Sequence, residues 1–199
     1  MSITFNIFKM PKLYFRYGCM NSSKSANLLM VAWNYRIQCR KVLLIKPKAD
    51  ERFGVNVIRS RAMGGGVEAD IVIDHEWSDI ESVETDSLDC VLVDEAQFLS
   101  EKNVDALREL STKVPVICYG LRSDYRARLF EGSKRLFEVA DVIEEIKTVC
   151  VNCDKKAIIN AKFILDDKGK RIILRDGSNQ LDLGSEEKYQ PMCWRCFSC

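Results

Sequence analysis

Short apolar runs alternate with stretches whose apolar positions recur at helical spacing through most of the chain. The runs predict buried strands at 13–17, 41–45, 69–73, 89–95, 114–120 and 141–146. The helical spacing predicts helices at 26–38, 101–110 and 129–139, with a weaker helix at 76–83. Strands that alternate with helices in this way form a mostly parallel sheet flanked by helices. We therefore expect an α/β domain over residues 11–148.

Two segments do not follow this pattern. Residues 1–10 have no clear period, and we interpret them as a loosely held N-terminal extension, although the alternating apolar residues within them would also suit an added edge strand. Residues 56–67 include three consecutive glycines, which hold regular structure poorly. We expect a mobile loop there.

The composition changes near residue 150. Four cysteines form two Cys-x-x-Cys pairs: Cys150, Cys153, Cys193 and Cys196. Between the pairs lie two runs with strand character, 157–165 and 171–174. Paired knuckles on β-hairpins form zinc ribbons, in which four thiolates complete a tetrahedral Zn²⁺ site and leave no open position. The pairs are further apart than is usual, and a redox pair is the alternative. We expect a structural zinc in a small domain over residues 149–199, and we assign Cys199 no role.

Composition and charge narrow the function. The chain has 199 residues, of which 47% are hydrophobic and 30% are charged, as in ordinary soluble globular proteins. Its net charge of +1 gives no indication of nonspecific nucleic-acid binding. No apolar run approaches the roughly 18 residues that span a membrane, and the N-terminus lacks a complete signal peptide. An odd count of nine cysteines argues against a disulfide framework. We expect a cytoplasmic protein that has neither a nucleic acid nor a membrane as its partner.

A candidate phosphate-binding loop lies between the first strand and the first helix. Its sequence GCMNSSKS has the first glycine and the closing Lys-Ser of the pattern G-x-x-x-x-G-K-[ST], with Ser23 in place of the second glycine. In such a loop, backbone N–H groups and the helix dipole face the phosphates, Lys24 reaches the β/γ-phosphates, and Ser25 binds Mg²⁺. A serine-rich turn that caps the helix is the alternative. The residues expected to contact ATP are Gly18, Cys19, Met20, Asn21, Ser22, Ser23, Lys24 and Ser25.

Charged side chains follow two other predicted strands. Asp94 ends an apolar strand, which is the Walker B pattern for a Mg²⁺ ligand, and Glu95 lies one residue further toward the ligand, where a general base belongs. An acidic helix N-cap is the alternative. Asp50 and Arg52 lie after the second strand, at the sheet edge where parallel sheets bind ligands. We expect Asp50 to help hold the metal and Arg52 to contact phosphate, the alternative being a solvated charged loop.

Together these motifs resemble those of the cytosolic thymidine kinases, a P-loop family with a zinc ribbon, and the bacterial members look closest. The resemblance covers residues 10–196. The segments that carry it are GCMNSSKS at 18–25, DERFG at 50–54, VDEAQFL at 93–99, YGLRSDYRARLF at 119–130, EIKTVCVNC at 145–153 and GSEEKYQPMCWRC at 184–196. It implies a RecA-like P-loop domain followed by a small domain containing the zinc ribbon and a loop, the lasso, that closes over the base.

The resemblance also implies roles for individual residues. Glu95 would take the proton of the nucleoside 5′-OH as it attacks the γ-phosphate. The residues implied to contact the nucleoside, in the thymine pocket and in the lasso, are Met20, Phe98, Leu121, Tyr125, Phe130, Gly184, Ser185, Glu186 and Tyr189. The zinc ribbon would anchor the lasso. The family further implies a homotetramer and feedback inhibition by dTTP.

The main hypothesis is therefore ATP-dependent phosphorylation of thymidine and deoxyuridine for nucleotide salvage. One alternative is a P-loop ATPase with a zinc ribbon that acts on nucleic acid, in which Glu95 activates water. Another is a nucleotide-binding protein that has lost turnover through Ser23. If the backbone at Ser23 is left-handed, we expect strain of about 1–2 kcal/mol. We then expect ATP binding to be modestly weakened, so that Ser23→Gly raises kcat/KM for ATP by up to about tenfold.

Overall fold

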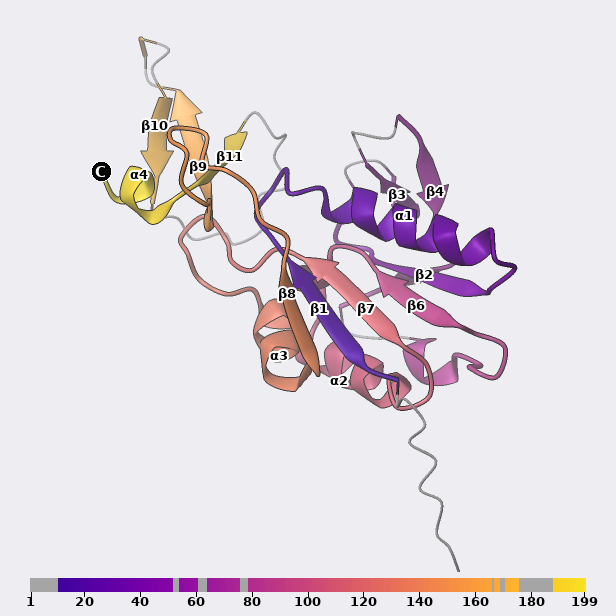
Figure 1. Cartoon of the computed structure of the whole chain (residues 1–199). Helices are drawn as coiled ribbons and strands as arrows, with labels where there is room; N and C mark the ends of the chain where they lie inside the picture. Colours follow the sequence, from indigo (N-terminus) through magenta and orange to yellow (C-terminus); the bar gives the residue numbers. More distant parts are fainter. Residues whose placement is uncertain are drawn as a thin grey trace, which may run out of the picture.

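The protein contains a six-stranded sheet in the order β5-β2-β6-β7-β1-β8, in which all neighbouring strands run parallel (Figure 1). The computed structural model describes residues 11–51, 54–60, 64–75, 79–165, 167–168, 171–175 and 188–199, so the N-terminal extension lies outside the described residues. The strands of this sheet are β1 (Leu13–Tyr17), β2 (Val42–Pro47), β5 (Ile71–Ile73), β6 (Cys90–Val93), β7 (Val116–Gly120) and β8 (Val142–Glu145). The predicted parallel sheet is confirmed.

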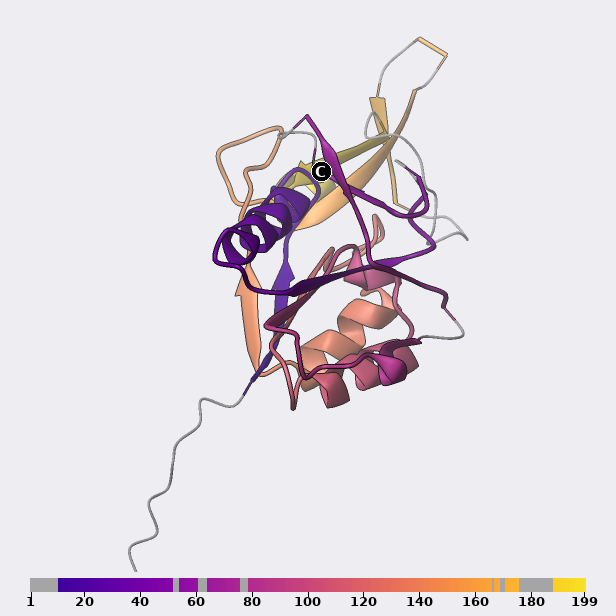
Figure 2. The same ribbon diagram turned by 90° about the vertical axis from the view of Figure 1, so that its right-hand side faces the viewer.

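Three α-helices cover the two faces of the sheet: α1 (Lys24–Arg36), α2 (Glu101–Leu110) and α3 (Glu131–Val139). Helix α1 lies on one face, and α2 and α3 lie on the other (Figure 2). The alternation of side chains along β6 divides the interior accordingly. Leu92 packs in one core with Leu28 of α1, whereas Val91 and Val93 pack in the other core with Leu107 of α2. The apolar runs are continuous because both faces of the sheet are buried.

Helix α2 illustrates how local sequence sets the element boundaries. The Ser100 side chain caps the helix by accepting a hydrogen bond from the Asn103 N–H at 3.2 Å. Glu101 places a negative charge in the first turn, where it complements the helix dipole. Val104 and Leu107 then fall on one face and are fully buried. The cap and the apolar face together fix where the helix begins and which side packs against the sheet.

A second, antiparallel sheet has the order β10-β9-β11 and lies beyond one edge of the parallel sheet (Figure 1). Its elements are β9 (Ile159–Leu165), β10 (Arg171–Leu174) and β11 (Tyr189–Met192), and the short helix α4 (Trp194–Ser198) follows β11. Ile159, Met192 and Phe197 form its small core together with Cys150 and Cys193. The predicted hairpin between the two cysteine pairs is therefore present.

The prediction of a loop at 56–67 is wrong for the described part of that segment. Strands β3 (Val57–Arg59) and β4 (Gly66–Glu68) pair antiparallel. Ile58 is almost fully buried in the core beneath α1, and Val67 packs against the same core. This burial of apolar side chains outweighs the poor strand propensity of the glycines.

The prediction of a helix at 76–83 is also wrong, because the described part forms only a short 3₁₀ turn, Asp79–Ser82. Ile80 is buried within that turn and anchors it to the core. One buried residue supports one turn, which is too little apolar surface for a longer amphipathic helix. Among the described residues, none of the helices combines the length and the apolar character needed to cross a membrane.

Candidate functional site

The predicted site residues gather at the carboxyl ends of the parallel strands. The phosphate-binding loop follows β1, Asp50 follows β2, Asp94 follows β6, and Leu121 follows β7. Because all these strands are parallel, the segments that follow them meet along one edge of the sheet. Residues that are distant in the sequence are thereby brought together by the topology alone.

The phosphate-binding loop is fixed at its start by close backbone packing. The Gly18 N–H donates to the Gly120 carbonyl at 3.2 Å, which ties the loop to β7. A Cβ at position 18 would lie 2.4 Å from both the Ile146 carbonyl oxygen and Ser22 Oγ, so only glycine fits there. Helix α1 then begins at Lys24, and the N–H groups of its first turn face the loop. The arrangement provides N–H groups and a helix N-terminus for a phosphate.

Backbone strain is concentrated at this site. Asn21 and Ser23 in the loop have φ values of 62° and 63°, and Glu95 after β6 has a φ of 48°. Left-handed backbone costs an L-residue about 1–2 kcal/mol. Three of the five non-glycine residues with positive φ in the described part of the chain thus lie at the candidate site. Strain that persists at one place is typical of functional sites, where the surrounding structure holds it.

Replacing Ser23 by glycine should stabilise the fold by about 0.5–1 kcal/mol, because relief of left-handed strain exceeds the entropy that glycine adds to the unfolded chain. Ser23 is left-handed, but relief of that strain stabilises the folded protein as a whole, so we expect a smaller effect on ATP binding than the gain of up to about tenfold expected from the sequence. We expect the Tm to rise by about 1–4 °C, with kcat/KM for ATP within about threefold. Thermal unfolding measures the Tm, and ATP titrations at saturating thymidine measure kcat/KM for ATP.

Ser23→Ala is the matched control, because it keeps the Cβ and removes only the hydroxyl. Its Tm should stay near that of the wild type. An equal rise in the alanine variant would show that strain is not the cause. A large loss of activity in both variants would instead assign a role to the hydroxyl, which makes no capping hydrogen bond in this structure.

Side chains suited to phosphate and Mg²⁺ lie at the helix end. Lys24 Nζ donates to the Cys19 carbonyl at 2.8 Å, and Ser25 Oγ donates to Asp94 Oδ1 at 3.2 Å. Burial, followed by the neighbouring Glu95 carboxylate, raises the pKa of Asp94 to about 7. A divalent cation would favour the charged form of this carboxyl group. A hydroxyl and a carboxylate oxygen in contact are ligands that Mg²⁺ prefers, so these residues fit the expected metal.

Asp50 lies close to the same edge but is engaged with a neighbour. Its carboxylate forms an ion pair of 3.3 Å with Lys46, and both side chains are buried. Lys46 Nζ also donates to the carbonyls of Gly54 and Val57, at 3.0 and 2.9 Å. The lysine therefore fixes Asp50 against the start of β3. Arg52, the other residue predicted in this loop, lies outside the described residues.

Several residues of the expected nucleoside pocket lie together. The rings of Phe98 and Phe130 meet edge to face, with centroids 5.7 Å apart. Lys162 of β9 brings Tyr125 and Tyr189 together, because its Nζ lies 5.2 Å from one ring centroid and 6.0 Å from the other. Strand β11 thus places Tyr189 near the parallel-sheet domain. The lasso residues Gly184, Ser185 and Glu186 lie outside the described residues.

The structure adds polar residues that the sequence reasoning missed. Gln97 is buried beside Glu95, within the VDEAQFL segment, so its proximity to a predicted catalytic residue was the available signal. Asn160 Oδ1 of β9 accepts from the Met20 N–H at 2.7 Å. Nothing in the local sequence of Asn160 indicates this contact, which arises only from the packing of the two sheets. Lys46 could have been suspected as a charged residue in a buried strand.

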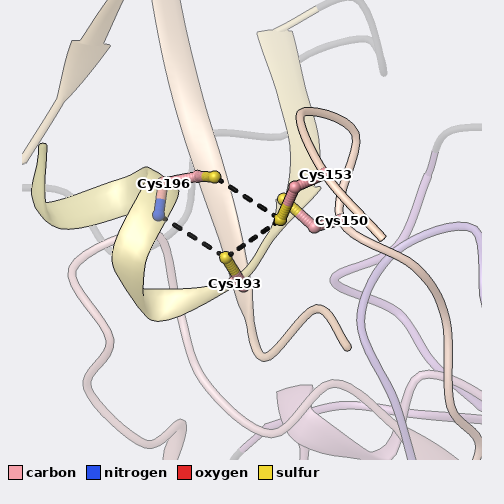
Figure 3. A group of neighbouring side chains, drawn as sticks. All are labelled: Cys150, Cys153, Cys193 and Cys196. Carbon is pink, nitrogen blue, oxygen red and sulfur yellow. Dashed lines mark hydrogen bonds between the residues drawn. The ribbon is translucent and has the colours of Figure 1, made fainter. Parts of the chain in front are cut away.

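The four predicted zinc ligands meet at one point (Figure 3). The Sγ atoms of Cys150, Cys153, Cys193 and Cys196 all lie within 4.8 Å of one another. Cys153 Sγ is 3.6 Å from that of Cys193 and 3.7 Å from that of Cys196. Four sulfurs at about 2.3 Å from a tetrahedral zinc ion would be about 3.8 Å apart, so the cluster fits Zn²⁺.

Backbone N–H groups donate hydrogen bonds to two of these sulfurs and favour their thiolate form. The Asn152 N–H donates to Cys150 Sγ at 3.4 Å, and the Cys196 N–H donates to Cys193 Sγ at 3.5 Å. Burial acts to raise the pKa of Cys150, but the backbone hydrogen bonds outweigh it and lower that pKa to about 7. Zinc binds the thiolate form, so these contacts favour binding. Cys199 is exposed and is not part of the cluster.

Comparison with known proteins gives consistent matches along nearly the whole chain. A sequence profile of the family described as Thymidine kinase matches residues 11–197. A Thymidine kinase of Pasteurella multocida is 41% identical over 191 residues, which cover 92% of this chain and 95% of that protein. A Thymidine kinase of Lactococcus lactis is 45% identical over 188 residues, with 92% and 95% covered.

Among solved structures, the ATPase DotB of Legionella pneumophila matches 83% of this chain and 44% of that chain, with a TM-score of 0.40 and 15% identity. That likeness is too slight to bear on the fold or the function. The profile, in contrast, extends from the phosphate-binding loop to the last cysteine pair, and each of the two relatives covers 92% of the chain. The chain belongs to the thymidine kinase family.

Proposed function

We propose that the protein transfers the γ-phosphoryl group of ATP to the 5′-OH of thymidine, and of deoxyuridine, in nucleotide salvage. The observation that carries this proposal is the contact between Ser25 Oγ and Asp94 Oδ1, with Glu95 adjacent. This contact brings the phosphate-binding loop next to a carboxylate suited to a metal, with a second carboxylate beside it, at one edge of the sheet. Phosphoryl transfer needs this combination of charge neutralisation and positioning.

In the proposed mechanism the loop 18–25 cradles the ATP phosphates with its N–H groups. Lys24 would leave the Cys19 carbonyl to meet the β/γ-phosphates. Mg²⁺, held by Ser25 and Asp94 with Asp50 nearby, would neutralise the charge on the phosphates. Glu95 would accept the proton of the nucleoside hydroxyl as its oxygen attacks the γ-phosphorus.

The nucleoside would bind beside this loop, between the two sheets. Phe98 and Phe130 would contact the flat base, and Met20, Leu121 and Tyr125 would complete the pocket. Tyr189 and the lasso residues 184–186 would close over the base and exclude water, which suppresses hydrolysis of ATP. The zinc ribbon, with Zn²⁺ on its four cysteines, would anchor that closure.

The test is ADP release with and without nucleoside. We expect ADP formation that depends on thymidine or deoxyuridine. We expect deoxyadenosine and deoxyguanosine to be at least about 10³-fold poorer in kcat/KM, because a purine leaves the polar groups of a pyrimidine pocket unpaired. Stimulation by nucleic acid instead would indicate an ATPase, and no ADP at all would indicate a binding protein. Comparable kcat/KM for a purine would contradict the pocket assignment.

We also propose that the protein is a homotetramer that works in the cytoplasm and is inhibited by dTTP. Met30 and Trp33 of α1 and Ile37, which follows its last residue, are 53%, 66% and 60% exposed, and their spacing places them on one side. Such an apolar stripe suits contact with a second copy.

All nine cysteines are free, as expected in a reducing compartment. Because dTTP joins thymidine to a triphosphate, its base and sugar would occupy the nucleoside pocket while its phosphates reach the phosphate-binding loop.

Replacing Trp33 by glutamate should dissociate the assembly, because it puts a charge into an apolar contact. Light scattering coupled to size exclusion measures the change in mass. Asn34→Glu is the matched control, since it adds the same charge to an exposed neighbouring position. A monomeric wild type, or an unchanged mass for Trp33→Glu, would exclude this face as the contact.

A further inference from the structure

Gln97 lies between the carboxylate of Glu95 and the backbone that follows β7. Its Nε2 donates to Glu95 Oε2 at 2.5 Å, and its Oε1 accepts from the Leu121 N–H at 2.9 Å. Gln97 is only 2% exposed and Glu95 only 9% exposed. A buried amide that makes two hydrogen bonds in opposite directions is held in one orientation.

The chemistry of the partners fixes that orientation. The Leu121 N–H can only donate, so the amide atom that faces it is the oxygen. The amide nitrogen must then face Glu95, where it can donate to a carboxylate. Hydrogen bonds to an ionised acceptor are the stronger kind. The contact between Gln97 and Glu95 therefore holds the carboxylate in one orientation.

The backbone at Gly120 leaves the space that the Gln97 side chain occupies. Gly120 has no side chain, and a Cβ there would lie 2.9 Å from Gln97 Oε1 and 3.1 Å from the Gln97 N–H nitrogen. Leu121 is held from its other side as well, because its carbonyl accepts from Ser133 Oγ at 2.5 Å. The Leu121 backbone is thus a rigid reference point for the amide. The backbone of Glu95 is in the left-handed region and is therefore strained. Contacts with the surrounding structure must hold it in place.

We infer that Gln97 is a positioning residue that sets the Glu95 carboxylate at a fixed place relative to the nucleoside pocket, with Gly120 providing the space. This inference rests on the proposed function, in which Glu95 is the general base and Leu121 lines the pocket. The amide donates to Oε2 of Glu95 and so fixes the direction in which the carboxylate faces. Gln97 acts on the reaction only through Glu95, because its two polar atoms are already committed to protein partners.

The first test is Gln97→Met, which keeps the length of the side chain and removes both hydrogen bonds. A misplacement of about 1 Å at a reacting group costs about 10²-fold. We expect kcat to fall about 10- to 100-fold, with KM for thymidine and for ATP within about threefold. Gly120→Ala, which displaces the amide without changing it, should lower kcat in the same way. Gln38→Met, an exposed position, should have no effect.

A double-mutant cycle separates positioning from a structural role. In the background of Glu95→Gln, the change Gln97→Met should lower kcat by less than about threefold, because the group through which it acts is already lost. Equal losses in both backgrounds, or a loss expressed in KM alone, would overturn the inference. If Glu95→Gln alone retained full kcat, the assignment of the base would fail instead. The two failures are therefore distinguishable.

Discussion

Glu95→Gln is expected to lower kcat by about 10²- to 10⁴-fold, which is the usual contribution of a general base. Glutamine matches the glutamate in shape and can still accept a hydrogen bond from Gln97 through its side-chain oxygen. It cannot take a proton at neutral pH. Since the substitution keeps the shape of the side chain and leaves Lys24 and Ser25 unchanged, ATP affinity should stay within about threefold. Steady-state kinetics with thymidine and an ATP-binding titration measure the two effects.

The control for this substitution is Glu109→Gln, which makes the same chemical change at an exposed position of α2. Its kcat should equal that of the wild type. Retention of kcat within about threefold in Glu95→Gln would exclude this carboxylate as the base. A parallel loss of ATP affinity would point to a role at the phosphates rather than in proton transfer.

Cys153→Ser is expected to abolish zinc binding and to disorder the small antiparallel sheet. Structural zinc sites contribute folding free energy directly, about 10–16 kcal/mol in zinc-finger peptides. The wild type should contain one zinc ion per chain, and the variant should contain almost none. Because Tyr189 lies on β11, which leads into Cys193, we expect KM for thymidine to rise at least about tenfold. Elemental analysis and kinetics measure these changes.

Cys199→Ser serves as the control, because Cys199 is close in sequence but outside the cluster. It should retain both zinc and activity. The order of the effects is informative as well: thymidine binding should weaken before ATP binding, since the phosphate-binding loop belongs to the parallel-sheet domain. A wild type without zinc but with full activity would contradict the assignment.

The parallel sheet and its order of elements could be predicted because both faces are buried. Val91, Leu92 and Val93 are fully buried although they point to opposite sides, and this produces the continuous apolar run seen in the sequence. Ile58 shows where such reasoning fails. A single buried side chain in a strand of three residues gives no local period, so the hairpin of β3 and β4 depends on its packing beneath α1.

The site was predictable where the chemistry is carried by a contiguous motif. Ser25 and Asp94 were chosen from separate motifs, and the structure places their side chains in contact. Residues that act through distant partners were not accessible in this way. Gln97 makes one of its two hydrogen bonds to Leu121, 24 positions away, and Asn160 contacts a loop 140 positions away. Sequence patterns report on neighbours along the chain, whereas these contacts exist only after folding.

The hydrogen bond from the Met20 N–H to Asn160 bears on how this protein can be engineered. It joins the phosphate-binding loop to β9, and Arg122 adds a second link by donating to the Ile158 carbonyl at 2.9 Å. Residues 11–148 and 149–199 therefore do not form interchangeable modules. A chimera that takes its ribbon from a relative must also supply an acceptor for Met20, since otherwise a partly buried N–H in the phosphate-binding loop would lose its partner. Exchange of the two parts will succeed only when both sides of these two hydrogen bonds are transferred together.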